Sequence, residues 1–159
     1  MSDITDDHAH FMQQALIEAQ KAVALGVVPV GAIVVVEGKI IARAHNEVEQ
    51  RGDATAHAEM LAVQHASETL SDWRLNTAVL YVTLEPCTMC IGAMLLSRVK
   101  ELYFGCADPA QGAVGSLFNL ADLSGLPHKI EVRSGIYSKE SETLLKDFFA
   151  KARKGRATS

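Results

Sequence analysis

Hydrophobic residues that recur three and four positions apart predict helices along much of the chain. In the N-terminal segment, Phe11, Ala15 and Ala19 would share one face of a helix that ends near Gly26. Similar spacing predicts five helices, over about residues 8–25, residues 56–70, about Pro86 to Ser97, Leu117–Leu123 (a short one) and Ser138–Ala152.

Two of these helices have start signals of their own. Asp53 or Thr55 could serve as the N-cap of the helix over residues 56–70, because short polar side chains accept hydrogen bonds from free N–H groups. Pro86 suits the first position of the next helix, where its missing N–H group would have no partner in any case.

Runs of β-branched and aliphatic residues predict five strands between the helices. Their ranges are Val30–Val36, Lys39–Ala44, Val79–Leu84, Val99–Phe104 and Lys129–Arg133. Glu37-Gly38 predicts a short hairpin between the first two strands, whereas Asn46–Asp53 and Asp108–Ser116 are expected to be loops. This order predicts an α/β fold, a three-layer α/β/α sandwich with a mixed five-stranded sheet.

The chain of 159 residues fits one domain, with about residues 1–7 and 155–159 expected to be flexible tails. Its acidic start lacks the basic and apolar regions of a signal peptide, and no apolar stretch is long enough to span a membrane. Three cysteines, two of them in Cys87-x-x-Cys90, favour metal or redox chemistry over disulfides. We therefore expect a cytoplasmic protein with no membrane partner.

The net charge of −4 argues against non-specific binding of polyanions by the whole surface. Basic residues do gather near the C-terminus, at Lys151, Arg153, Lys154 and Arg156. Such a tail is a weak signal for nucleic acid, because exposed terminal lysines and arginines are also common for solubility.

The candidate chemistry lies in Thr55-Ala56-His57-Ala58-Glu59 and Glu85-Pro86-Cys87-Thr88-Met89-Cys90, each at the expected start of a helix. Cys87 and Cys90 would share a face of the first helical turn, where backbone N–H groups favour thiolates. With the His57 imidazole they make three ligands of the types that zinc prefers, which leaves a fourth position for water. That pattern is typical of a catalytic zinc site, not a structural one.

Glu59 is the candidate catalytic residue, because one carboxylate beside an activated water can move the protons of a hydrolysis. Residues two apart on a regular helix point in nearly opposite directions. We therefore assume that His57 and Glu59 straddle the start of the helix.

Simpler interpretations exist for each part. Alone, Cys-x-x-Cys is equally consistent with a redox pair or half of a structural zinc site. Cys106 could complete a four-ligand site, but its pattern favours a small buried residue. His65 is expected on the surface, and we assign no role to the terminal or polar histidines His8, His10 and His128. The combination of His-Ala-Glu with Pro-Cys-x-x-Cys is far more specific than either half.

With these motifs the chain resembles the cytidine deaminase superfamily, whose signature is H-x-E followed by P-C-x-x-C. Over nearly its whole length it is similar to the bacterial tRNA-specific adenosine deaminases of that superfamily. The similar segments are Val28-Pro29-Val30-Gly31-Ala32, His45-Asn46, Thr55–Glu59, Leu80–Cys87, Asp108, Gly112-Ala113, Gly115-Ser116-Leu117 and Asp147-Phe148-Phe149. The segments from Asp108 onward discriminate best, because free-nucleoside deaminases lack them in this form.

The resemblance implies a cytidine deaminase-like fold and a homodimer that binds one zinc ion per subunit. It also implies zinc-dependent hydrolysis of adenosine to inosine at the wobble position, 34, of a tRNA anticodon stem-loop. In this interpretation Asn46 hydrogen-bonds the flipped base, Val30 packs on its ring, and Ala58 and Glu59 lie at the reacting edge. Asp108 would contact a nearby ribose, and Phe149 would line the path of the anticodon.

The residues expected to contact substrate also suit purely structural roles. Asn46, Val30, Asp108 and Phe149 are consistent with a loop, a strand, a loop and a core position. A deaminase of a free base or nucleoside, such as guanine or cytosine, is the main alternative function. A non-catalytic zinc-stabilised RNA-binding subunit and a thiol redox protein are two further ones.

Overall fold

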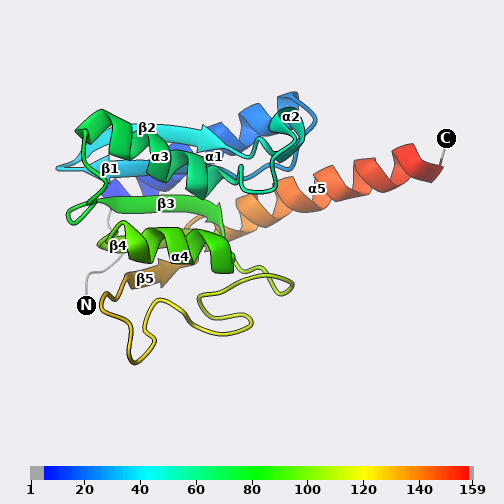
Figure 1. The fold of residues 1–159 in the computed structure, drawn as a ribbon. Coiled ribbons are helices and arrows are strands. Elements are labelled where there is room, and N and C mark those ends of the chain that lie inside the picture. Colours follow the sequence, from blue (N-terminus) through cyan, green and yellow to red (C-terminus); the bar gives the residue numbers. More distant parts are fainter. Residues whose placement is uncertain (1–5, 158–159) are drawn as a thin grey trace.

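The computed structural model describes residues 6–157, which form one mixed sheet between two layers of helices (Figure 1). The elements in chain order are α1 (Asp6–Ala24), β1 (Gly31–Val36), β2 (Lys39–His45), α2 (Val48–Arg51), α3 (Ala58–Leu70), β3 (Val79–Leu84), α4 (Thr88–Leu96), β4 (Glu101–Cys106), β5 (Glu131–Ser134) and α5 (Ser138–Ala157). The predicted α/β class and five-stranded sheet are confirmed.

The sheet has the strand order β2-β1-β3-β4-β5. β1 pairs antiparallel with both β2 and β3, whereas β3, β4 and β5 run parallel to one another. The predicted hairpin between β1 and β2 turns at Glu37 and Gly38, whose φ angles of 51° and 74° are those of a tight hairpin turn.

Side chains that alternate along the strands build two cores on opposite faces of the sheet. On one face, Val34, Val82 and Leu102 of the sheet pack in the same core as Ile91 and Met94 of α4. On the other face, a smaller cluster covered by α1 consists of Met12, Ala15, Ile33, Val35, Tyr81, Tyr103 and Ile136. The N-terminal part of α5 packs on β4 next to α1, and its C-terminal part projects beyond the body of the molecule (Figure 1).

Two local predictions are wrong. The expected loop Asn46–Asp53 contains the short helix α2. Residues Leu117–Leu123 form no helix, because their backbone groups bond back to the preceding loop. The Leu117 N–H donates to Gly112, the Leu120 N–H donates to Ala113, and Val114 bridges Asn119.

The predicted helix starts are also wrong in detail. His57 occupies the N-cap position of α3, and the Asp53 side chain instead accepts hydrogen bonds from Thr55. Pro86 lies before the N-cap Cys87 and outside α4. Of the tails expected to be flexible, residues 6–7 and 155–157 belong to α1 and α5, and the remainder lies outside the described residues.

Candidate active site

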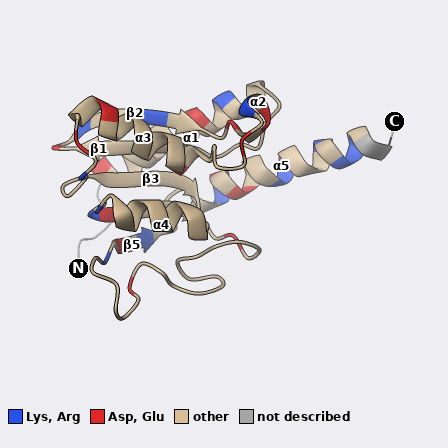
Figure 2. Cartoon of the chain, viewed as in Figure 1, with Lys and Arg blue, Asp and Glu red and all other residues tan. Residues whose placement is uncertain are grey.

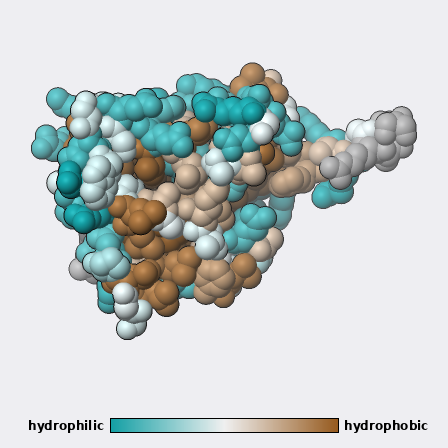
Figure 3. Space-filling view, viewed as in Figure 1, coloured by the Kyte–Doolittle hydropathy of each residue, from teal (hydrophilic) through white to brown (hydrophobic). Residues whose placement is uncertain are grey.

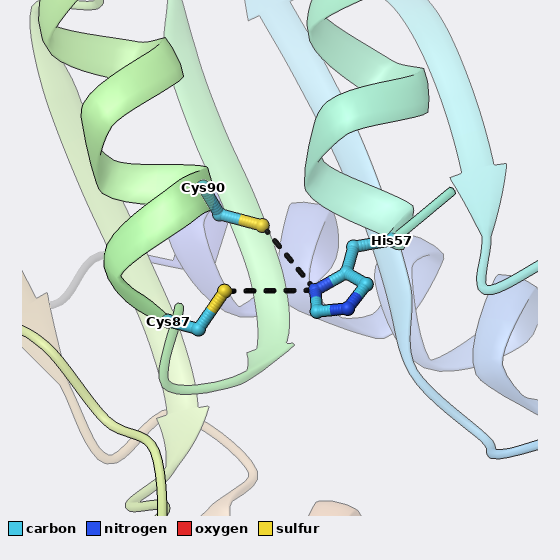
Figure 4. A group of neighbouring side chains, drawn as sticks. All are labelled: His57, Cys87 and Cys90. Carbon is cyan, nitrogen blue, oxygen red and sulfur yellow. Dashed lines mark hydrogen bonds between the residues drawn. The ribbon is translucent and has the colours of Figure 1, made fainter. Parts of the chain in front are cut away.

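His57, Cys87 and Cys90 meet where the N-terminal ends of α3 and α4 lie side by side (Figure 4). His57 Nδ1 is 3.6 Å from Cys87 Sγ and 3.6 Å from Cys90 Sγ. The three ligand atoms lie within 4.8 Å of one another. Residues thirty positions apart in the chain are therefore brought together by the packing of two helix starts on one sheet.

The local backbone explains why these side chains are available. His57 and Cys87 are both N-cap residues with extended backbone angles, and neither side chain makes a capping hydrogen bond. Their side chains consequently leave the helix axis and point into the space between α3 and α4 (Figure 4). Both helix starts direct free N–H groups toward this space, which favours negative charge there.

This donor set fits a zinc ion. Tetrahedral zinc with a sulfur ligand at about 2.3 Å and a nitrogen ligand at about 2.05 Å separates the two atoms by about 3.6 Å. The distances from His57 Nδ1 to both sulfur atoms agree with that value. A thiolate pair and one imidazole also match the chemical preference of the ion.

The pKa values of the two thiol groups are shifted in opposite directions. Hydrogen bonds from Cys90 and His57 lower the pKa of Cys87 to about 3, although burial opposes the shift. The neighbouring Cys87 sulfur and burial raise the pKa of Cys90 above its ordinary value. A divalent cation would lower the pKa of both thiol groups, because it stabilises the two thiolates together.

Glu59 is the second residue of α3, and its side chain is only 5% exposed. Burial raises the pKa of this carboxyl group, and its partners include the Cys90 thiol. His57 and Glu59 line the same pocket because His57 is extended and Glu59 is helical. The site thus holds a buried carboxyl group directly beside the three ligand atoms.

A cavity of about 540 Å³ opens above this site. Its wall includes the five residues expected to contact substrate, namely Val30, Asn46, Ala58, Asp108 and Phe149. In the same order, they come from the segment just before β1, the β2–α2 loop, α3, the loop after β4 and α5. Of the four predicted metal and catalytic residues, His57, Glu59 and Cys87 line the cavity, and Cys90 lies buried behind them.

Two of the polar wall residues are held by local hydrogen bonds. Asn46 Oδ1 accepts the Val48 N–H at 3.1 Å, which leaves the amide NH₂ group as the donor available to the cavity. Asp108 Oδ1 accepts the N–H groups of Ala110 at 3.0 Å and Gln111 at 3.2 Å. One carboxylate oxygen of Asp108 therefore stabilises the turn that begins at this residue.

Sequence reasoning missed Glu85. This residue also lines the cavity, although it is only 2% exposed. Burial alone would raise the pKa of this carboxyl group, but hydrogen bonds from Ser116, Asp108 and Val114 outweigh it and lower the pKa. A charged residue at the end of the buried strand β3 is the signal that could have identified it.

The remaining cysteine and histidines lie elsewhere. Cys106 is buried at the end of β4 and is not among the clustered ligand atoms. His128 bonds the carbonyl of Val99 at 2.8 Å. His8, to which the sequence assigned no role, contacts the buried Tyr81 at 2.7 Å and Tyr103 at 3.2 Å on the far face of the sheet.

Known proteins are similar to this chain in sequence along most of its length. Residues 6–153 match the family described as MafB19-like deaminase. A tRNA-specific adenosine deaminase of Bacillus subtilis (strain 168) is 49% identical over 146 residues, 91% of this chain and 89% of the relative. The chain belongs to this deaminase family. A relative of the same name from Aquifex aeolicus (strain VF5) is 46% identical and covers 91% of the chain and 95% of the relative.

Solved structures of deaminases share the fold. One, from a study of A-to-I editing by tRNA:A34 deaminases at the wobble position of transfer RNA, superposes with a TM-score of 0.82. It is 43% identical and covers 86% of this chain and 99% of that one. A guanine deaminase from Bacillus subtilis is more distant, with 28% identity, a TM-score of 0.61 and coverage of 74% and 85%. These likenesses confirm the expected cytidine deaminase-like fold.

The helices in the described part of the chain do not have the character of membrane spans. Within residues 6–157, none combines the length and the apolar character that a membrane span needs.

Proposed function

We propose that this deaminase converts adenosine to inosine at position 34 of a tRNA anticodon by zinc-dependent hydrolysis. The observation that supports it most is the group of His57, Cys87 and Cys90 beside the buried Glu59, at the floor of a cavity of about 540 Å³. The chain's 49% identity to a relative named tRNA-specific adenosine deaminase favours adenosine in tRNA over a free base.

His57, Cys87 and Cys90 would hold the zinc ion, one per subunit. When bound, zinc supplies Lewis acidity that makes a water molecule nucleophilic near neutral pH. The chain contributes the charge balance, because two thiolates and a neutral imidazole offset the charge of a divalent ion.

Glu59 is the proposed proton carrier of the reaction. Water adds its oxygen to C6 of the base, and the carboxylate takes one proton and passes it to ring nitrogen N1. Glu59 then moves the second proton to the departing amine, which leaves as ammonia while C6 becomes the carbonyl of inosine. Burial of the carboxyl group supports this role, since the raised pKa favours taking up a proton.

The cavity wall offers the contacts that a flipped base needs. The free amide NH₂ group of Asn46 would donate to the ring, Val30 would pack on its face, and Ala58 with Glu59 would meet the reacting edge. Asp108 would contact a ribose at the mouth, and Phe149, which is 45% exposed on α5, would stack along the anticodon path. An unpaired anticodon loop avoids most of the cost of opening a duplex.

The projecting part of α5 would contact the RNA backbone. Lys and Arg positions recur along the projecting part of this helix (Figure 2), and Lys151, Arg153 and Lys154 belong to its last turns. Arg153 follows Phe149 by four residues and therefore shares its face of the helix, which supports a phosphate contact near the cavity mouth. A tRNA substrate also supports the cytoplasmic location expected from the sequence.

The subunits would associate as a homodimer. Hydrophobic surface gathers over α4 and the segment that follows β4 (Figure 3), where Leu96 is 79%, Leu117 53% and Phe118 47% exposed. Large exposed apolar patches mark interaction sites. Sedimentation should give a dimer for the wild type and for Leu25→Glu, whose apolar side chain is exposed elsewhere, and a monomer for Leu96→Glu. A monomeric wild type would contradict this proposal.

One assay tests the function directly. The zinc-loaded deaminase is incubated with an anticodon stem-loop carrying adenosine 34, and in parallel with free adenosine, guanine and cytosine. Inosine at position 34 alone is the expected product. Turnover of a free base without conversion of the stem-loop would favour the alternative function.

A further inference from the structure

Glu85 is a buried carboxylate that accepts four hydrogen bonds from one loop. Its Oε1 accepts the Asp108 N–H at 3.1 Å and the Ser116 hydroxyl group. Its Oε2 accepts the N–H groups of Val114 and Ser116, each at 3.1 Å. Both ends of the 108–116 loop are therefore bonded to a single side chain at the C-terminal end of β3.

The loop closes tightly around this carboxylate. A Cβ at Gly112 would overlap the carboxylate carbon and oxygens of Glu85, so only glycine fits there. The Ala113 N–H donates to the carbonyl of Pro86 at 2.9 Å, and the Gly112 N–H donates to Asp108 at 2.8 Å. The loop thus rests on Glu85 and Pro86, the two residues directly before the metal ligand Cys87.

The same loop forms one wall of the cavity, through Asp108, Pro109, Ala110 and Gln111. We propose that Glu85 is a positioning residue, which holds this wall at a set distance from the metal ligands and so aligns Asp108 with the RNA substrate. The kinetic part of this proposal rests on the proposed function. Glu85 itself would take no part in proton transfer.

Glu85→Gln is the informative variant because it keeps the shape and removes two acceptor sites. An amide nitrogen at the Oε2 position would face two N–H donors, from Val114 and Ser116. At the Oε1 position it would face the Asp108 N–H, although the Ser116 hydroxyl could turn and accept. In either orientation the loop loses a backbone hydrogen bond. Glu131→Gln is the matched control, because this carboxylate on β5 is exposed.

The first measurement is amide hydrogen exchange, which does not depend on activity. In Glu85→Gln we expect exchange at Asp108, Val114 and Ser116 to rise at least about tenfold, while Leu102 in β4 stays within about twofold. Gly112→Ala should have the same effect, since its methyl group displaces the loop without changing a charge. Unchanged exchange in both variants would overturn the proposal.

The second measurement separates positioning from general support of the fold. With the stem-loop RNA, Glu85→Gln should keep one zinc per chain, raise KM about tenfold and lower kcat less than about threefold. On an Asp108→Ala background the same change should raise KM less than about threefold, because the wall residue that it aligns is already absent.

A fall in kcat with unchanged KM, loss of zinc, or the full tenfold effect on the Asp108→Ala background would each overturn the positioning role. If the wild type fails to convert the stem-loop, the proposed function falls instead. The hydrogen-exchange result would still test whether Glu85 holds the loop.

Discussion

Glu59 follows His57 by only two residues, yet both side chains line the same cavity. His57 has the extended angles φ −71° and ψ 152° of an N-cap residue, and Glu59 lies inside the first turn of α3. This change of backbone conformation between neighbours brings a candidate metal ligand and a carboxyl group to one cavity. In a regular helix they would point apart.

Replacing Glu59 separates metal binding from turnover. We expect Glu59→Ala to retain one zinc per chain, as measured by atomic absorption, and to lose at least about a hundredfold in kcat, because the proposed proton carrier is absent. Glu68→Ala on the exposed part of α3 is the control and should leave the rate unchanged. A near-normal rate in Glu59→Ala would disprove the assigned proton path.

Replacing Cys87, a candidate zinc ligand, should remove both zinc binding and turnover. Cys87→Ala should bind less than one zinc per chain and show no turnover, since two ligands hold the ion poorly. Chelation of the wild type should abolish activity in the same way, and added zinc should restore it. Cys106→Ala should keep the metal because its thiol lies outside the ligand cluster. Equal zinc loss in both cysteine variants would contradict the assignment.

Removing the Asn46 amide should weaken recognition of the base. We expect Asn46→Ala to lower kcat/KM for the stem-loop about tenfold, because the variant lacks the NH₂ group that is proposed to donate to the base. Asn76→Ala, an exposed change between α3 and β3, should match the wild type. Identical kinetics for the two variants would argue against a base contact.

Basic residues of α5 should govern the salt dependence of RNA binding. The combined change Lys151→Ala and Arg153→Ala should reduce the slope of log Kd against log salt concentration by about 1 for each phosphate that the variant no longer neutralises. Lys39→Ala, at the β1–β2 hairpin, should leave the slope unchanged. A slope unaffected by the α5 changes would show that the RNA backbone lies elsewhere.

Tyr81 links stability to alkaline pH. Burial, followed by the neighbouring Tyr103 and Glu101, raises the pKa of Tyr81 above its ordinary value of about 10. The raised pKa contributes stability below about pH 10, and this contribution is lost as the pH rises toward the folded value. As the pH rises above about 10, the melting temperature of the wild type should fall more steeply than that of Tyr81→Phe. Parallel curves would rule out this linkage.

The sequence alone determined the strands and the candidate metal ligands. A run of β-branched and aliphatic residues is a local signal, and such runs located all five strands to within about two residues. Cys87 and Cys90 share a helical turn, so their spacing indicates a common target without knowledge of the fold.

Only the tertiary structure decided how distant segments meet. Glu85 looks like an ordinary charged residue at a strand end, and its role appears only when the 108–116 loop folds back onto it. The helix expected over Leu117–Leu123 was overridden by hydrogen bonds to that same loop. Local propensity amounts to less than about 1 kcal/mol per residue, so long-range contacts that satisfy buried backbone groups prevail over it.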